Sequence, residues 1–329
     1  MRILTKALAA LVWAAALPGV AQSQAISTLS VITENTVQYI YDIADPLKIA
    51  SQPGVTPLGP VTSFYPLIAV QDVVSVNGRA AKGVVVLWGS GLNLSPNPQP
   101  GQAIADVGRV AAYDFRLDIQ GVDGRPVGTI VGSGLGGGPP GPGLPGGAGT
   151  LAITGGTGAF LGASGQFAYT GPGGSRRASM VEDPAKRRIN GGPPGAWLLQ
   201  LIPRTRPEVI MTANGLAIVH SSDFTLVTAS KPARPGEVLS LFATGLGPTR
   251  PGVEPGKPFP ADPLQVVNSP VEVTVNGRPA EVLAAVGFPG SVDGYQVNFR
   301  IPAESTRGSA TLQVSAAWIA GSEVRIPIQ

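Results

Sequence analysis

Alternation of apolar and polar residues marks several strands in the first two thirds of this chain. Every second residue from Val37 to Ile43 is apolar, and the same holds from Tyr113 to Ile119. Because successive side chains of a β-strand point to opposite faces, each set predicts a strand with one apolar face. The run from Val84 to Trp88 is apolar at every position, which predicts a strand covered on both faces. No stretch has a long, well-capped apolar pattern of helical period.

Composition supports the same fold class. The 329 residues include 45 Gly and 33 Pro, and 13% of the chain is charged against 43% hydrophobic. Such a chain favours short strands joined by Gly/Pro turns, and it keeps enough apolar residues for a core. We therefore predict an all-β protein. Its length is typical of two domains.

The N-terminus has the pattern of a secretory signal peptide over residues 1–25. Arg2 and Lys6 precede an apolar run from Ala7 to Val20, and small residues follow from Ala21 to Ala25. The run is too short for a stable membrane anchor, and no later segment resembles a membrane helix. We expect an exported protein that resides at the cell surface, in the periplasm or in the medium. Cysteine is absent, so core burial alone must hold the fold together.

Charge gives little support for a nucleic-acid partner. Removal of the leader takes Lys and Arg from 23 to 21 against 20 Asp and Glu, so the net charge falls from +3 to +1. The few aromatic residues are scattered rather than interleaved with basic ones. We predict no nucleic-acid partner and no membrane span.

Two low-complexity segments, 134–149 and 171–195, are predicted to be disordered loops. The second carries five basic residues, which suit either a solvated loop or contact with acidic polysaccharide or lipid headgroups. They are Arg176, Arg177, Lys186, Arg187 and Arg188. Residues 203–206 are predicted to link a domain over 26–202 to another over 207–329.

The glycine-rich stretch 152–166 has two interpretations. Its Thr-Gly-Gly-Thr-Gly sequence imitates a dinucleotide-binding turn, whose glycines let backbone amides approach a pyrophosphate. That turn must open a helix, but Gly171-Pro172-Gly173-Gly174 follows after a few alternating residues. We therefore favour a strand and predict no cofactor.

The same stretch carries a resemblance to a known superfamily. Residues Gly155 to Gly165 match the "GGTG-x-F-x-x-A-x-G" signature of the allene oxide cyclase and dirigent proteins. The resemblance implies an antiparallel eight-stranded β-barrel, in which the glycines permit a tight turn and a kinked strand. Members of that superfamily shape an apolar pocket around a reactive intermediate. None of their functional positions is transferred to this chain.

The C-terminal part resembles a different family. Residues 235–249, the Asn276-Gly277 turn and the strand patterns near 295–302, 312–314 and 324–328 are similar to an Ig-like domain of secreted bacterial proteins. The resemblance implies a β-sandwich of about seven strands and no catalytic residues. Residues 87–92 are similar in sequence to residues 241–246, so tandem Ig-like domains remain an alternative for the first domain.

The sequence offers few groups for chemistry. With no cysteine and one histidine, a His/Cys zinc site is excluded, and a Ser-His-Asp arrangement is possible only around His220. We expect a structural or surface histidine, no metal and no catalytic residue. Asp114, Arg116 and Asp118 share one face of the predicted strand at 113–119 and are the candidate ligand-binding residues. Facing the barrel interior they would hold a polar ligand; facing water they form an ordinary ion pair.

These patterns favour a secreted bacterial two-domain β protein that acts as an extracellular binding or surface-associated module. Its partner would be a small hydrophobic ligand or a component of the cell surface. The alternative is a dirigent-like or allene oxide cyclase-like barrel that directs the cyclisation or coupling of a small hydrophobic ligand. An open cavity with a polar side chain inside would favour that alternative.

Overall fold

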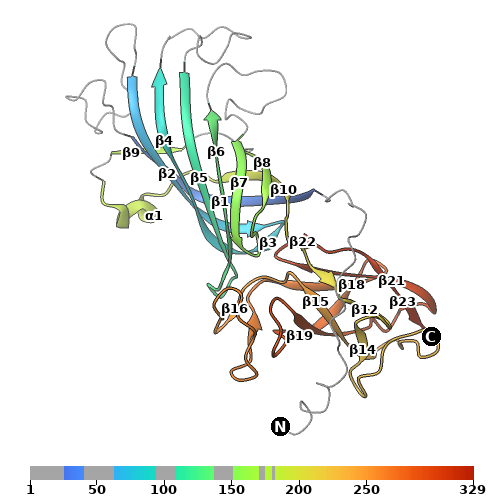
Figure 1. The fold of residues 1–329 in the computed structure, drawn as a ribbon. Coiled ribbons are helices and arrows are strands. Elements are labelled where there is room, and N and C mark those ends of the chain that lie inside the picture. The colour runs from blue at the N-terminus through green and yellow to red at the C-terminus, as the bar shows by residue number, and fades with distance from the viewer. Residues whose placement is uncertain (1–25, 41–62, 94–108, 137–150, 170–174, 180–181) are drawn as a thin grey trace. The chain divides into compact units, whose positions relative to one another are not determined.

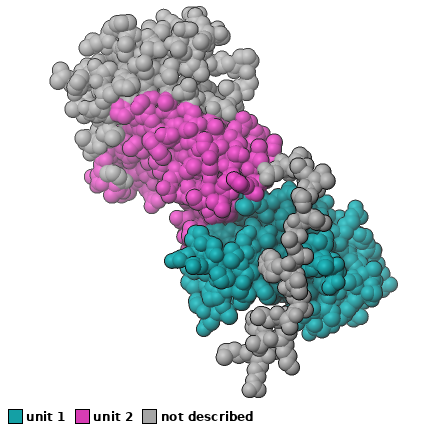
Figure 2. Space-filling model, viewed as in Figure 1, with its two compact units in different colours: residues 1–25, 205–329 teal, residues 26–204 magenta. Residues whose placement is uncertain are grey.

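The structure of this chain is a computed structural model (Figure 1). It describes residues 26–40, 63–93, 109–136, 151–169, 175–179 and 182–329. The predicted leader and most of segment 134–149 therefore lie outside the described residues. Two compact units, 26–204 and 205–329, divide the described chain within the predicted linker 203–206 (Figure 2).

The first unit is a closed antiparallel β-barrel of eight strands. The order β2-β4-β5-β6-β7-β8-β10-β1 closes because β1 also pairs with β2. This closed sheet excludes the alternative of a second Ig-like sandwich in residues 26–202. The barrel strands are β1 (Ser27–Ile40), β2 (Ser63–Val76), β4 (Lys82–Asn93), β5 (Arg109–Gln120), β6 (Pro126–Gly136), β7 (Leu151–Gly158), β8 (Ser164–Tyr169) and β10 (Gly195–Ile202), and the short β3 (Arg79–Ala80) forms a hairpin with β2.

Alternation on β5 places its apolar face inside the barrel, as the sequence predicts. Phe115, Leu117 and Ile119 are fully buried. On β1 the predicted apolar face is present up to Tyr39, and the rest of that pattern lies outside the described residues. For Val84–Trp88 the prediction of two covered faces is wrong. Val85 is buried, but Trp88 is 42% exposed, because alternate side chains of β4 point outward from a barrel wall.

The glycine-rich signature forms strand β7, a turn and strand β8, so the interpretation as a dinucleotide loop is wrong. Gly158 ends β7 with a φ of +61°, a conformation that suits glycine. The residues directly after it, 159–162, form a turn and not a helix. On β6, a Cβ on Gly132 would lie 2.2 Å from the carbonyl oxygen of Ala152 and 2.7 Å from Phe167. Glycine at this position therefore permits close packing between the barrel wall and an interior ring.

Strand β1 changes its partner half way along its length. Residues 27–33 pair with β10, whereas Val37–Ile40 pair in parallel with β9 (Arg176–Ser179). Register shifts lie between Ile32 and Val37, and Asn35 has a φ of +54°. An irregularity of this kind bends a strand and redirects its edge.

The prediction that residues 171–195 form a disordered loop differs from the structure. Besides β9, this segment contains a 3₁₀ turn (Pro184–Lys186) and a single helical turn, α1 (Arg187–Asn190). The amide of Thr36 on β1 donates to the carbonyl of Pro193, at 3.1 Å. Most of the segment is therefore attached to the barrel. Of segment 134–149, Gly134–Gly136 belongs to β6.

The second unit is a curled sheet of short strands. The main path runs β11-β15-β20-β19-β18-β21-β22, with β14, β16, β17 and β23 attached at its sides. Its strands are β11 (Glu208–Val209), β14 (Ile218–His220), β15 (Val238–Thr244), β16 (Thr249–Arg250), β17 (Val266–Val267), β18 (Val271–Val275), β19 (Arg278–Gly287), β20 (Tyr295–Arg300), β21 (Gly308–Ala316), β22 (Ile319–Ala320) and β23 (Val324–Ile328), and β12 (Met211–Thr212) forms a separate hairpin with β13 (Gly215–Leu216).

Strand β19 gives this sheet its curl. Its first residues, 278–280, pair with β18, and residues 281–287 pair with β20, with a register shift between Val282 and Ala284. The sheet encloses one apolar core whose fully buried members include Leu241, Phe299 and Leu312. The predicted Asn276-Gly277 hairpin is confirmed, since both residues have positive φ between β18 and β19.

Candidate functional site

Aromatic rings fill the described middle of the barrel. Phe115 and Phe167 have ring centroids 4.0 Å apart, and Trp197 lies 5.2 Å from the first and 5.7 Å from the second. The Gln71 side chain lies among buried groups and accepts hydrogen bonds from the Trp197 indole at 2.7 Å and from the Thr33 hydroxyl at 2.6 Å. These polar groups inside the barrel thus satisfy one another, and they stabilise the packing.

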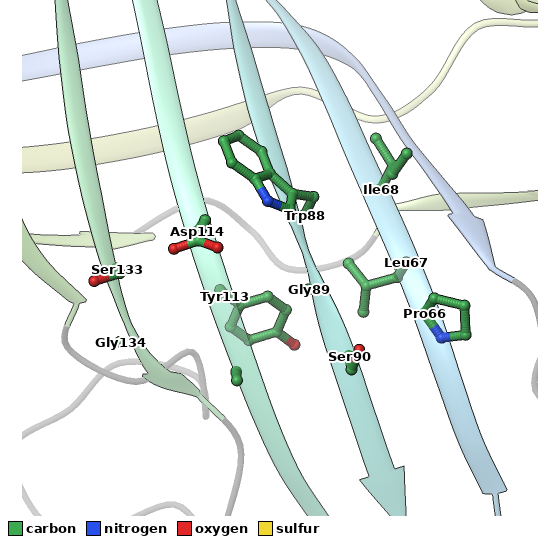
Figure 3. A pocket seen from close by; sticks show the side chains of 11 residues that line it. Pro66, Leu67, Ile68, Trp88, Gly89, Ser90, Tyr113, Asp114, Ser133 and Gly134 are labelled. Carbon is green, nitrogen blue, oxygen red and sulfur yellow. The ribbon is translucent and has the colours of Figure 1, made fainter.

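The candidate site is a pocket of about 670 Å³ on strands β2, β4, β5 and β6 (Figure 3). Its lining residues fall into three cross-strand rows, which the strand register defines. The first row is Ile68, Trp88, Asp114 and Ser133; the second is Leu67, Gly89, Tyr113 and Gly134; the third is Pro66, Ser90 and Ala112.

The register also assigns these rows to faces of the wall. Asp114 precedes the buried Phe115, so the first and third rows belong to the outward face, and the second row lies between them. The pocket therefore has two rows of outward side chains, and we call it the outer-face pocket. The interior rings described above are not part of it.

Small residues form the floor of the pocket, and the large side chain of Trp88 forms its wall. At Gly89, a Cβ would lie 1.8 Å from the carbonyl oxygen of Ala112, so the two strands approach closely there. Ser90 and Ala112 add little volume beside it. Trp88, in the first row, is 42% exposed, and its neighbour Ile68 is 39% exposed. The pocket thus presents an aromatic and an aliphatic side chain to solvent.

The three predicted ligand-binding residues all lie on the outward face, and the structure separates one from the other two. Arg116 donates from Nε to both carboxylate oxygens of Asp118, at 3.1 and 3.0 Å. The Thr129 hydroxyl also donates to Asp118, at 2.6 Å. The Arg116 side chain is 54% exposed, so this pair is worth little to stability. Asp114 alone of the three lines the pocket.

Sequence reasoning missed a cluster of charges around Asp72 on β2. Arg187 donates to Asp72 at 2.7 Å, and Arg188 donates from two nitrogens at 3.1 Å each. Asn35 completes the set with a hydrogen bond of 3.0 Å. Burial by itself would raise the pKa of Asp72, but these hydrogen bonds outweigh it and lower the pKa to about 2. Nothing in the local sequence pairs residue 72 with residues 187 and 188.

A second ion pair fixes the same segment. Arg176 donates to both oxygens of Glu182, at 2.8 and 2.7 Å, and its Nε donates to the carbonyl of Gly191 at 2.7 Å. The hydrogen bond from Arg176 lowers the pKa of Glu182. Three of the five basic residues that suggested an anion-binding loop are therefore engaged in the fold. Arg187 and Arg188 hold the segment to β2, and Arg176 ties parts of the segment to each other.

His220 lies in a structural setting. It is buried, with Nδ1 2.6 Å from a carboxylate oxygen of Glu237 and Nε2 3.2 Å from the carbonyl oxygen of Lys231. Ser221, its neighbour in sequence, shares a hydrogen bond with Ser240 instead. Both ring nitrogens face acceptors, so the Ser-His-Asp arrangement considered for His220 is not assembled.

Compared with known proteins, the chain matches no family model and no curated protein sequence. In the described ranges, no group of three or more His, Cys, Asp or Glu side chains is placed to hold a metal ion. None of the helices in those ranges has the length and apolar character of a membrane span.

Proposed function

We propose that this chain is a secreted two-domain β protein whose barrel binds a small, largely apolar ligand at the outer-face pocket. The observation that carries the proposal is the exposure of Trp88 and Ile68 side by side over a hollow floored by small residues. Ligand pockets are typically concave, mostly apolar and provided with a few polar groups. Here Asp114, Ser90 and Ser133 supply the polar groups.

The apolar surface exposed at this pocket sets the energy available for binding. A tryptophan side chain of about 250 Å² that is 42% exposed offers roughly 100 Å² for burial. At about 25 cal/mol per Å², covering it contributes about 2.5 kcal/mol. Ile68 adds to this sum, and the total corresponds to an affinity in the millimolar range for a ligand that covers both side chains.

The resemblances of the sequence support the rest of the proposal. Residues 1–25 have the pattern of a signal peptide, and the dirigent-like signature belongs to β7 and the turn after it in an eight-stranded barrel. For the second unit we propose an Ig-like sandwich. The sharing of β19 between β18 and β20 around one core supports it, since strands that pass between sheets are frequent in sandwiches.

A barrel that directs a cyclisation or coupling reaction is the rival proposal. It requires an internal cavity with a polar side chain directed at the ligand. The contacts among Phe115, Phe167 and Trp197, and the engagement of Gln71 with Trp197, weigh against such a cavity at the middle of the barrel. The accessible pocket on the outer face therefore favours binding.

Titration with a neutral fluorescent probe, N-phenyl-1-naphthylamine, tests the proposed function. We expect saturable binding of one probe per chain, weakened at least about fivefold by Trp88→Leu, because the aromatic wall is lost. Leu198→Ala is the matched control, since Leu198 on β10 has a similar exposure of 38% but lies outside the pocket lining. Equal binding by the wild type and the Trp88 variant would contradict the proposal.

A further inference from the structure

We propose that the ligand of the outer-face pocket is a small organic cation with an apolar body, such as an alkylammonium compound. This inference rests on the proposed function and names its ligand class. It follows from the position of Asp114, whose carboxylate lies between Trp88 on one neighbouring strand and Ser133 on the other (Figure 3).

The two carboxylates of the β5 outward face have different surroundings. Asp118 is engaged by Arg116 and by the Thr129 hydroxyl. Among the described residues, no Lys or Arg forms an ion pair with Asp114. Arg116, the nearest cation along the strand, has its guanidinium directed to Asp118. The pocket therefore contributes a negative charge that the described part of the barrel does not neutralise.

Trp88 and Asp114 together have the chemistry that recognises an organic cation. The face of an indole attracts a cation through its quadrupole, and a nearby carboxylate adds a direct charge interaction. Register pairs these residues directly across β4 and β5, so their Cβ atoms are about 4.5–5.5 Å apart. One ammonium group can contact both side chains while its alkyl part covers Ile68. An anionic ligand of the same shape would be repelled by Asp114.

The test uses three probes of one chain length with different charges. Hexyltrimethylammonium chloride, hexanol and sodium hexanoate are titrated into the full mature chain at pH 7.5 by isothermal calorimetry. We expect the cation to bind about five- to tenfold more tightly than hexanol, with hexanoate weakest. Raising NaCl to 1 M should reduce the preference for the cation, because salt screens exposed charges.

Paired variants assign the effect to one carboxylate. Asp114→Asn keeps the size of the side chain and removes its charge, so it should weaken binding of the cation about fivefold and leave hexanol unchanged. Asp123→Asn, in the turn between β5 and β6 and outside the pocket lining, is the control, and it should change the binding of neither probe. Circular dichroism at 25 °C confirms that both variants remain folded.

The outcomes separate this inference from the proposed function. If the cation and hexanol bind equally and Asp114→Asn has no effect, while Trp88→Leu weakens both, the inference is overturned and the apolar pocket stands. If none of the three probes nor the fluorescent amine binds in a Trp88-dependent way, the proposed function itself fails.

Discussion

Replacing Asp72 by Asn tests whether the charge cluster on β2 holds residues 175–194 against the barrel. The ordinary pKa of an aspartate is 3.8, and hydrogen bonds from Arg188, Arg187 and Asn35 lower that of Asp72 to about 2 against the opposing effect of burial. Each tenfold change in proton affinity corresponds to about 1.4 kcal/mol, so the depression is worth at most roughly 2.5 kcal/mol. Because Arg188 is 72% exposed and solvent screens it, we expect about 1–2 kcal/mol.

The pH dependence of this contribution has a defined sign. A carboxyl group whose pKa is lower in the folded state stabilises the fold above its unfolded pKa. The contribution of Asp72 is therefore fully present above about pH 5 and is lost as pH falls from about 4 towards 2. In urea unfolding, the difference between wild type and Asp72→Asn should be largest at pH 7 and should be mostly lost near pH 2.

Limited digestion with trypsin reports the local effect, since Lys186, Arg187 and Arg188 are cleavage sites. We expect Asp72→Asn to be cut there about tenfold faster than the wild type at pH 7, because local opening costs less free energy. Asp183→Asn, an exposed change in the same segment, is the matched control. Identical digestion rates and identical unfolding midpoints at pH 7 would refute the reasoning.

Two further substitutions test packing. Gly132→Ala should destabilise the barrel by about 2–3 kcal/mol, since the added Cβ would clash with Ala152 and Phe167. Gly155→Ala is the control, because its Cβ would contact only a Val131 methyl at 3.4 Å. Thermal unfolding compares the two variants, and equal melting temperatures would count against the close approach at Gly132. His220→Leu should destabilise the second unit by about 2–4 kcal/mol, because the Glu237 carboxylate loses its histidine partner. Hydrogen exchange at residues 218–241 measures this loss of stability, and unchanged protection of those amides would contradict the prediction.

Strand positions were predictable from the sequence because alternation reports directly which face of a strand is buried. The pattern from Tyr113 to Ile119 identified the inward face of β5, and Asn276-Gly277 identified a hairpin through its tolerance of positive φ. The continuous apolar run at Val84–Trp88 led to the wrong prediction that both faces of the strand are covered, and the reason is physical. Sequence alone does not distinguish a strand covered on both faces from one whose outer face bears a pocket.

The candidate site was only partly predictable. Asp114 was recognised as a candidate because it shares a face with two other charged residues. The sequence does not show that Arg116 pairs with Asp118 and leaves Asp114 apart. The pocket depends on cross-strand register among four strands, and Asp72 meets Arg187 across 115 positions of sequence. Contacts of this range arise from closure of the barrel, which local patterns do not encode.

The change of partner along β1 has a consequence for solubility. Hydrogen bonds from β9 occupy the edge of β1 at Val37–Ile40, where β10 no longer reaches. Deleting residues 175–194 would expose unpaired amide and carbonyl groups beside the apolar side chains of Val37 and Tyr39. An open edge of this kind recruits strands from other molecules. The segment that the sequence predicts to be a disordered loop therefore covers an edge of the barrel at which other chains could otherwise pair.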